Sequence, residues 1–234
     1  MPSVKEIQRE LKRRGFYKGE IDGIKGPLTC SAISQFKATI GYKATPYVGP
    51  LTTAALFDAR PDKTFDSNAP KWLRMAASYL GLVEYRGSKH NPKIIEWWSK
   101  IRAPFTDDET PWCAGFVGGV LEECGIVSSR SASARSFLNW GVEIDGPCVG
   151  CIVVFWRGSP KGWSGHVGFV VGRDINGNLM VLGGNQGDAV NIKPFSQSRV
   201  LGYRWPKSEK LPLRIGKGQL PVVKSDGKLS TNER

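Results

Sequence analysis

The sequence lacks the features that mark a membrane-spanning or secreted chain. No stretch reaches the roughly 20 consecutive apolar residues that a membrane helix needs, and residues 1–6 lack the apolar core of a secretion signal. We therefore expect a soluble protein made in the cytoplasm, without stable insertion into a membrane. If its target lies outside the membrane, another factor must release it.

Histidine and cysteine are both scarce. The chain has two histidines and five cysteines, namely Cys30, Cys113, Cys124, Cys148 and Cys151. An odd number of cysteines without a secretion signal favours free thiols over disulfides. The spacing of Cys148 and Cys151 suits a redox pair or half of a zinc site, but further zinc ligands at a suitable spacing are lacking, and redox pairs usually open a helix rather than a strand. We expect neither a metal nor a cofactor.

Positive charge dominates. The chain carries 33 Lys and Arg against 21 Asp and Glu, a net charge of +12. Such a surface attracts nucleic acid, anionic lipid or anionic cell wall, because long-range attraction depends on charge more than on chemistry. A basic surface that only maintains solubility fits equally well, so charge alone selects no partner.

The length of 234 residues and the changes in pattern predict two domains and a tail. Residues 1–58 predict three short helices, two of them entered by a Gly-Pro-Leu-Thr turn, with Thr29 expected to cap the second helix. Residues 59–70 are polar, contain two prolines and predict a linker. Residues 207–234 are basic and rich in Gly and Pro, and we expect them to be loosely ordered.

Residues 71–206 predict an α+β domain. Apolar residues at helical spacing indicate helices near 70–80 and 91–100. Short runs of β-branched and aromatic residues then predict three strands, at 152–156, 167–171 and 179–182. Helices followed by strands indicate helices packed on an antiparallel sheet.

Cys113 is the candidate nucleophile. Thr110 is a suitable N-cap and Pro111 suits the first helical position, so we expect Cys113 at the third residue of a helix. Backbone N–H groups and the positive end of the helix dipole favour the thiolate there. The same N–H groups can stabilise an oxyanion.

His166 is the candidate base, because it begins a predicted strand whereas His90 lies in a polar loop. The Asn176-Gly177 turn predicts a hairpin that places residues 185–187 opposite His166. We expect the side-chain oxygen of Asn185 to orient the imidazole, with Gln186 as the nearby substitute.

The N-terminal 57 residues resemble the peptidoglycan-binding domain of many cell-wall enzymes. The segments that carry the resemblance are Ile7-Gln8, Gly15-Phe16-Tyr17, Ile21-Asp22-Gly23, Gly26 to Thr29 and Ala32-Ile33. The resemblance implies bacterial peptidoglycan as the partner of a monomeric chain, with no nucleic acid. The helix pattern by itself also fits a generic three-helix module.

Residues 72–205 are similar to the CHAP and NlpC-type cysteine amidohydrolases of bacterial walls. Trp112-Cys113-Ala114, Gly165-His166-Val167-Gly168 and Gly183-Gly184-Asn185-Gln186 carry the likeness, which implies a papain-like fold and the triad Cys113, His166 and Asn185. Some relatives have an acidic residue where Gly183 stands, and Cys151 stands where relatives typically have Asp. The further substrate-binding candidates are Glu84, Asp108 and Gln186, with Trp112, Trp140, Trp156 and Trp163 as possible groove walls.

A hydrolase with a binding module in front resembles a modular bacteriophage endolysin. This resemblance implies cleavage of an amide in the peptide part of peptidoglycan, by an endopeptidase or an N-acetylmuramoyl-L-alanine amidase, after release through a membrane pore for host lysis. Two alternatives stay open. Glu84 with Asp107, Asp108 or Glu109 provides the carboxylates of a glycosidase, and an inactive second domain leaves a non-catalytic wall-binding protein.

Overall fold

The computed structural model describes residues 2–39, 44–58, 68–85, 90–213, 215–216, 218, 220–223 and 229–230. Their apolar side chains form two separate cores, one within residues 7–56 and the other within residues 72–220. Within the described segments, no helix combines the length and the apolar character needed to cross a bilayer.

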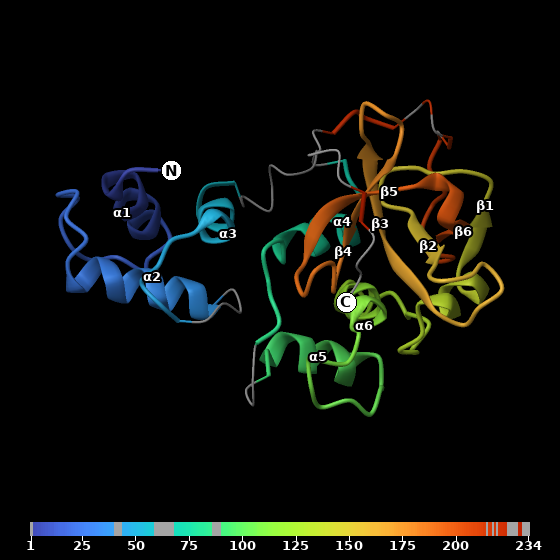
Figure 1. The fold of residues 1–234 in the computed structure, drawn as a ribbon, viewed down its shortest axis with the longest axis horizontal. Helices are drawn as coiled ribbons and strands as arrows, with labels where there is room; N and C mark the ends of the chain where they lie inside the picture. The colour runs from blue at the N-terminus through green and yellow to red at the C-terminus, as the bar shows by residue number, and fades with distance from the viewer. Residues whose placement is uncertain are drawn as a thin grey trace.

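The smaller core lies between three helices, as predicted: α1 (Val4–Arg13), α2 (Pro27–Thr39) and α3 (Pro50–Thr53), which continues as a π-helical turn, Ala54–Asp58 (Figure 1). A capping box begins α1, because Ser3 Oγ accepts from Glu6 N at 3.3 Å while Glu6 Oε2 accepts from Ser3 N at 2.7 Å. Leu11 and Leu56 are fully buried in this core.

A buried polar side chain, Gln8, organises the connection between α1 and α2. Its Nε2 donates to Asp22 Oδ1 at 2.7 Å and to Thr29 Oγ1 at 3.0 Å, and its Oε1 accepts from Gly23 N at 2.8 Å. Thr29 thus lies inside α2, which begins at Pro27. The expected capping role of Thr29 is wrong, because the hydroxyl is engaged by Gln8.

The larger core lies against a fully antiparallel six-stranded sheet with the order β1-β6-β2-β3-β4-β5. The α+β prediction is confirmed, and the three predicted strands are β2, β3 and β4. The strands are β1 (Val142–Ile144), β2 (Ile152–Trp156), β3 (Gly165–Arg173), β4 (Leu179–Gly183), β5 (Asn191–Phe195) and β6 (Val200–Trp205). Three strands, β1, β5 and β6, were not predicted.

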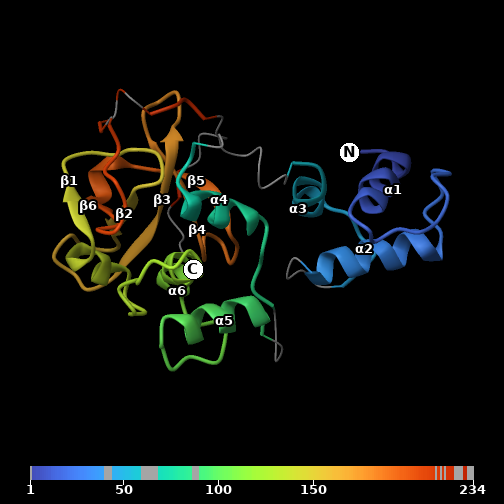
Figure 2. The same cartoon turned by 180° about the vertical axis from the view of Figure 1, so that it is seen from behind.

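Helices α4 (Lys71–Ser78), α5 (Pro92–Lys100) and α6 (Cys113–Glu123) precede the sheet, and the 3-10 turns η2 (Ala134–Asn139) and η3 (Gln197–Arg199) accompany it. Helix α6 lies between α5 and the sheet (Figures 1 and 2). Its glycines permit this close packing. A Cβ atom at Gly115 would lie 3.0 Å from the Trp98 ring, and one at Gly118 would lie 2.6 Å from Ile101. A glycine inside a helix lowers the stability of the helix by about 1 kcal/mol relative to alanine, and the close packing of α6 against its neighbours offsets this loss.

The described part of the tail packs against the larger domain. Leu220 is buried in the core, Arg173 N donates to Pro221 O at 2.9 Å, and Ser230 N donates to Pro194 O at 2.8 Å. The expectation of a loosely ordered tail is wrong for these residues, because their backbone pairs with the ends of β3 and β5. Most of the predicted linker, residues 59–67, lies outside the described residues.

Candidate active site

Cys113 is the first residue of α6, two positions nearer the helix start than predicted. Trp112 occupies the N-cap position without a side-chain cap. Thr110 is not the cap, because its backbone N donates to Asp107 Oδ1 at 2.6 Å within the preceding turn. The first turn of a helix presents N–H groups without intrahelical acceptors and the positive end of the dipole. Cys113 therefore lies at a helix N-terminus, as expected, and its side chain is buried.

His166 is the second residue of β3 and is fully buried. Its ring stacks on Phe195 of β5, with centroids 5.1 Å apart and planes at 4°, and Phe195 stacks in turn on Phe155 at 4.7 Å. Phe155 is also the residue of β2 that pairs with His166 in the sheet. These aromatic contacts fix the plane of the imidazole.

The amide that contacts His166 belongs to Gln186. His166 Nε2 lies 3.0 Å from Gln186 Oε1. The amide nitrogen of Gln186 faces three acceptors, Asn191 Oδ1 at 2.8 Å, Asn191 O at 2.9 Å and Val181 O at 3.4 Å. Because these acceptors require the NH₂ group on their side, the amide oxygen faces the imidazole, and His166 Nε2 donates the hydrogen bond. The basic nitrogen of the neutral ring is then the buried Nδ1.

This geometry corrects the expectation that Asn185 orients His166. The pairing of Phe169 with Leu182, extended along the hairpin, would place residue 185 opposite His166, as predicted. However, β4 ends at Gly183, and Asn185 adopts a left-handed conformation with φ of 58°. This turn ends the strand alternation, and the next residue, Gln186, folds back toward the ring.

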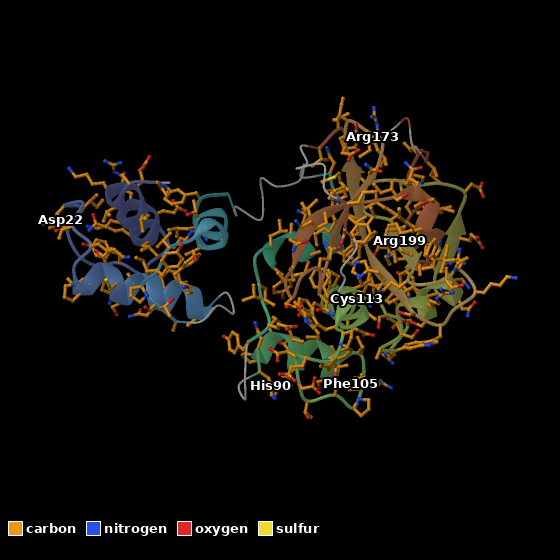
Figure 3. All side chains as sticks on the ribbon, in the orientation of Figure 1. Asp22, His90, Phe105, Cys113, Arg173 and Arg199 are labelled. Carbon is orange, nitrogen blue, oxygen red and sulfur yellow. The ribbon has the colours of Figure 1, made fainter. Side chains whose placement is uncertain are left out.

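Two adjacent glycines connect the imidazole to the start of α6. A Cβ atom at Gly183 would lie 3.1 Å from His166 Nε2, and one at Gly184 would lie 2.6 Å from the Trp112 ring and 2.5 Å from Phe116 Cβ. Adjacent Cα atoms are only about 3.8 Å apart. The residues flanking Cys113 and the imidazole therefore contact the same short segment. Figure 3 shows Cys113 where α6 meets the sheet.

Trp112 and Glu84 form a supporting contact beside Cys113. Trp112 has no exposed surface and donates from Nε1 to Glu84 Oε2 at 3.2 Å. The covered ring leaves Trp112 no surface for the expected contact with substrate. Burial raises the pKa of the partly exposed Glu84, and the carboxylates of Asp188 and Asp108 raise it further.

Asp108 is also enclosed rather than open to substrate. Its fully buried carboxylate accepts from Tyr85 N at 2.7 Å and Asn91 N at 2.8 Å, and it lies 2.9 Å from His90 Nδ1. These bonds hold the segment that enters α5, and the buried carboxylate has no exposed surface for the expected contact with substrate. Figure 3 places His90 beside α5 and away from Cys113.

The remaining tryptophans proposed as groove walls differ in exposure. Trp140 is partly buried and donates from Nε1 to Val127 O at 2.8 Å, and Trp156 donates to Ser198 O at 3.2 Å. Trp163 is 89% exposed in the loop before β3. Trp163 is thus the member of the set with the most surface for a ligand.

Cys148 and Cys151 are buried free thiols in the turn that precedes β2. Cys148 N donates to Cys151 Sγ at 3.4 Å, and the positive φ of Gly150 closes the turn. The hydrogen bond from Cys151 lowers the pKa of Cys148, whereas burial raises that of Cys151. The described residues contain no cluster of three or more His, Cys, Asp or Glu arranged to hold a metal.

A thiol at a helix start and an imidazole in contact with an amide are the kinds of group that a cysteine hydrolase uses. Residues 1–56 match the family described as putative peptidoglycan binding domain, and residues 105–185 match the CHAP domain. The two matches show an N-terminal peptidoglycan-binding domain and a CHAP domain, a combination that supports a peptidoglycan hydrolase of the amidase or peptidase type. No curated protein matches the chain.

The signals for Cys113 and His166 were present in the sequence. Asn191 and Phe195, which contact Gln186 and His166, were missed because they lie on the unpredicted strand β5. Pro194 within β5 weakens any strand signal there, since proline is confined to edge strands, and β5 is an edge of this sheet.

Proposed function

We propose that the chain hydrolyses an amide bond in the peptide part of bacterial peptidoglycan, with Cys113 as nucleophile, His166 as base and Gln186 as the orienting group. The observation that carries this proposal is the 3.0 Å contact between His166 Nε2 and Gln186 Oε1. It leaves Nδ1 as the basic nitrogen of the ring, on a strand against which the Cys113 helix packs.

The reaction begins with proton transfer from Cys113 Sγ to His166 Nδ1. The thiolate attacks the carbonyl carbon of the scissile amide, and backbone N–H groups in the first turn of α6 stabilise the oxyanion. Protonated His166 returns the proton to the departing amine, which leaves a thioester on Cys113. Water, deprotonated by His166, then hydrolyses the thioester to a carboxylate and restores the thiol.

Glu84 is the candidate for a contact with the stem peptide. Its carboxylate is partly exposed and is held by Trp112, the residue immediately before Cys113. An anionic group in this position can attract an ammonium group of the stem peptide, because the charges are opposite and the site is partly desolvated.

Each of the two hydrophobic cores belongs to a domain with its own proposed role. Residues 1–58 bind peptidoglycan and raise the local concentration of substrate for a catalytic domain at 71–206, with 59–70 as linker. We propose that the chain acts as a monomer without nucleic acid. Its modular order supports a bacteriophage endolysin, held in the host cytoplasm and admitted to the wall through a membrane pore.

The test is mass spectrometry of fragments released from purified walls. Amide hydrolysis yields new amino and carboxyl ends, and their masses identify which amide is cut, whereas glycosidase activity yields new reducing sugar ends. The Cys113→Ala variant should release no fragments while still sedimenting with walls. Reducing ends, or undiminished release by Cys113→Ala, would contradict the proposal.

A further inference from the structure

Asn191 contacts Gln186 through three of its polar atoms. Its Oδ1 and backbone O accept from Gln186 Nε2 at 2.8 and 2.9 Å, and its Nδ2 donates to Gln186 O at 2.7 Å. Asn191 begins β5, directly opposite Gly183 at the end of β4. The sheet thus holds Asn191 in place on one side of Gln186, while His166 lies on the other.

We propose that Asn191 is a positioning residue, which fixes the orientation of the Gln186 amide and thereby keeps the proton of neutral His166 on Nε2. The inference deepens the proposed function, and rests on it only for the consequence for catalysis. Asn191 acts on His166 through Gln186, which contacts both residues.

The link between Asn191 and the His166 tautomer follows from the contacts that a reversed Gln186 amide would make. With its oxygen and nitrogen exchanged, Gln186 would point its oxygen at the two acceptor oxygens of Asn191. Its NH₂ group would then face His166 Nε2, which would have to accept and therefore lose its proton. The proton would move to Nδ1, the nitrogen that must take the proton from Cys113. Asn191 therefore favours the tautomer in which His166 can act as a base.

Gly183 makes room for this arrangement. A Cβ atom at position 183 would lie 2.5 Å from Gln186 Oε1 and 3.1 Å from His166 Nε2, so a methyl group would press on both partners of the hydrogen bond. The absence of a side chain at Gly183 is what allows the Gln186 oxygen to reach the ring. The pairing of Gly183 with Asn191 places this space beside the residue that holds the amide.

The test is the tautomer of His166, read from the nitrogen chemical shifts of protein labelled with ¹⁵N-histidine. The chain has only two histidines, so the variant His90→Gln assigns the signals. Wild type should show His166 protonated at Nε2. Asn191→Leu removes both side-chain bonds and should show a mixture of the two tautomers.

Asn191→Asp is the matched control. It keeps an oxygen that accepts from Gln186 Nε2, while the donor to Gln186 O is replaced by a carboxylate oxygen that carries negative charge. We expect Asn191→Asp to retain the Nε2 proton, and Asn191→Leu to lower kcat on a soluble stem-peptide substrate by about 3- to 10-fold with KM unchanged. A merely structural role for Asn191 would affect both variants alike. The proposal is overturned if Asn191→Leu keeps the wild-type tautomer, or if Asn191→Asp loses it equally.

The tautomer measurement requires no peptidoglycan. If the wild-type protein releases no wall fragments, the proposed function fails, while the nitrogen shifts still decide whether Asn191 sets the tautomer. Alkylation of Cys113 by iodoacetamide as a function of pH gives a second substrate-free readout. The acidic limb of its rate profile should shift in Asn191→Leu relative to wild type.

Discussion

Each domain buries one glutamine, and the two glutamines have different partners. Gln8 bonds to Asp22, Gly23 and Thr29, all within the loop and helix that follow α1. The amide nitrogen of Gln186 likewise donates within its own domain, to Asn191. Its amide oxygen, however, faces the ionisable ring of His166. The comparison separates a buried amide whose partners all hold one domain together from a buried amide that also contacts the proposed catalytic base.

The largest effect should come from removing the ring that Gln186 orients. His166→Ala should lower the hydrolysis rate by about 1,000-fold or more, because it removes the proposed base that takes the proton of Cys113. Turbidity loss of purified walls provides the measurement. His90→Gln is the matched control and should stay within about 3-fold of wild type, since His90 contacts Asp108 beside α5. Equal losses in both variants would contradict the assignment.

Removal of the orienting amide should have the next largest effect. Gln186→Ala leaves the buried Nε2–H of His166 without its acceptor, which should lower kcat by about 10- to 100-fold with little change in KM. Steady-state kinetics on a soluble stem peptide measure both constants. Asn185→Gly preserves the left-handed turn and should reduce kcat far less. The reverse ranking would restore Asn185 as the orienting residue.

Gln8 should affect binding rather than chemistry. Gln8→Ala leaves several buried groups of the N-terminal domain without their partner and should destabilise that domain by about 2–3 kcal/mol. Sedimentation with walls should weaken, whereas kcat on the soluble peptide should not change. Gln35→Ala, an exposed glutamine on α2, is the control and should retain wall binding. A fall in kcat for Gln8→Ala would show that the two glutamines are not independent.

The smallest expected effect is the contribution of Glu84 to the pH dependence of stability. Burial raises the pKa of Glu84 above its usual 4.5, so the folded protein holds this proton more tightly than the unfolded chain. The stability of wild type relative to Glu84→Gln should therefore fall as the pH rises through the window above 4.5. Urea unfolding of both proteins at about pH 4 and pH 7 measures the difference. A difference that is constant with pH would refute this pKa shift.

The parts of the fold with strong local signals were predictable. The runs at 152–156 and 179–182 correspond to β2 and β4 because contiguous apolar residues between turns form buried strands. In contrast, β1 has three residues, and β5 contains a proline and faces a single neighbouring strand. These strands depend on tertiary pairing, which the local pattern does not carry.

The residues of the candidate site also divide into those that local sequence patterns predict and those that depend on tertiary pairing. The places of Cys113 at a helix start and of His166 near the start of a strand followed from the helix and strand patterns, and their catalytic roles stay predictions. The choice between Asn185 and Gln186 depended on the residue at which β4 ends and on one left-handed φ, and a shift of one residue reverses which side chain faces the ring. Asn191 could not be found at all, since its role depends on the pairing of β4 with β5.

The most direct test of the central claim is to trap the covalent intermediate. Wild-type protein mixed with stem-peptide substrate and quenched in acid should show, by mass spectrometry, an acyl group from the stem peptide on Cys113, and Gln186→Ala should accumulate it more slowly. An acyl group on another residue, or wall cleavage that proceeds while Cys113 is blocked by iodoacetamide, would contradict the account.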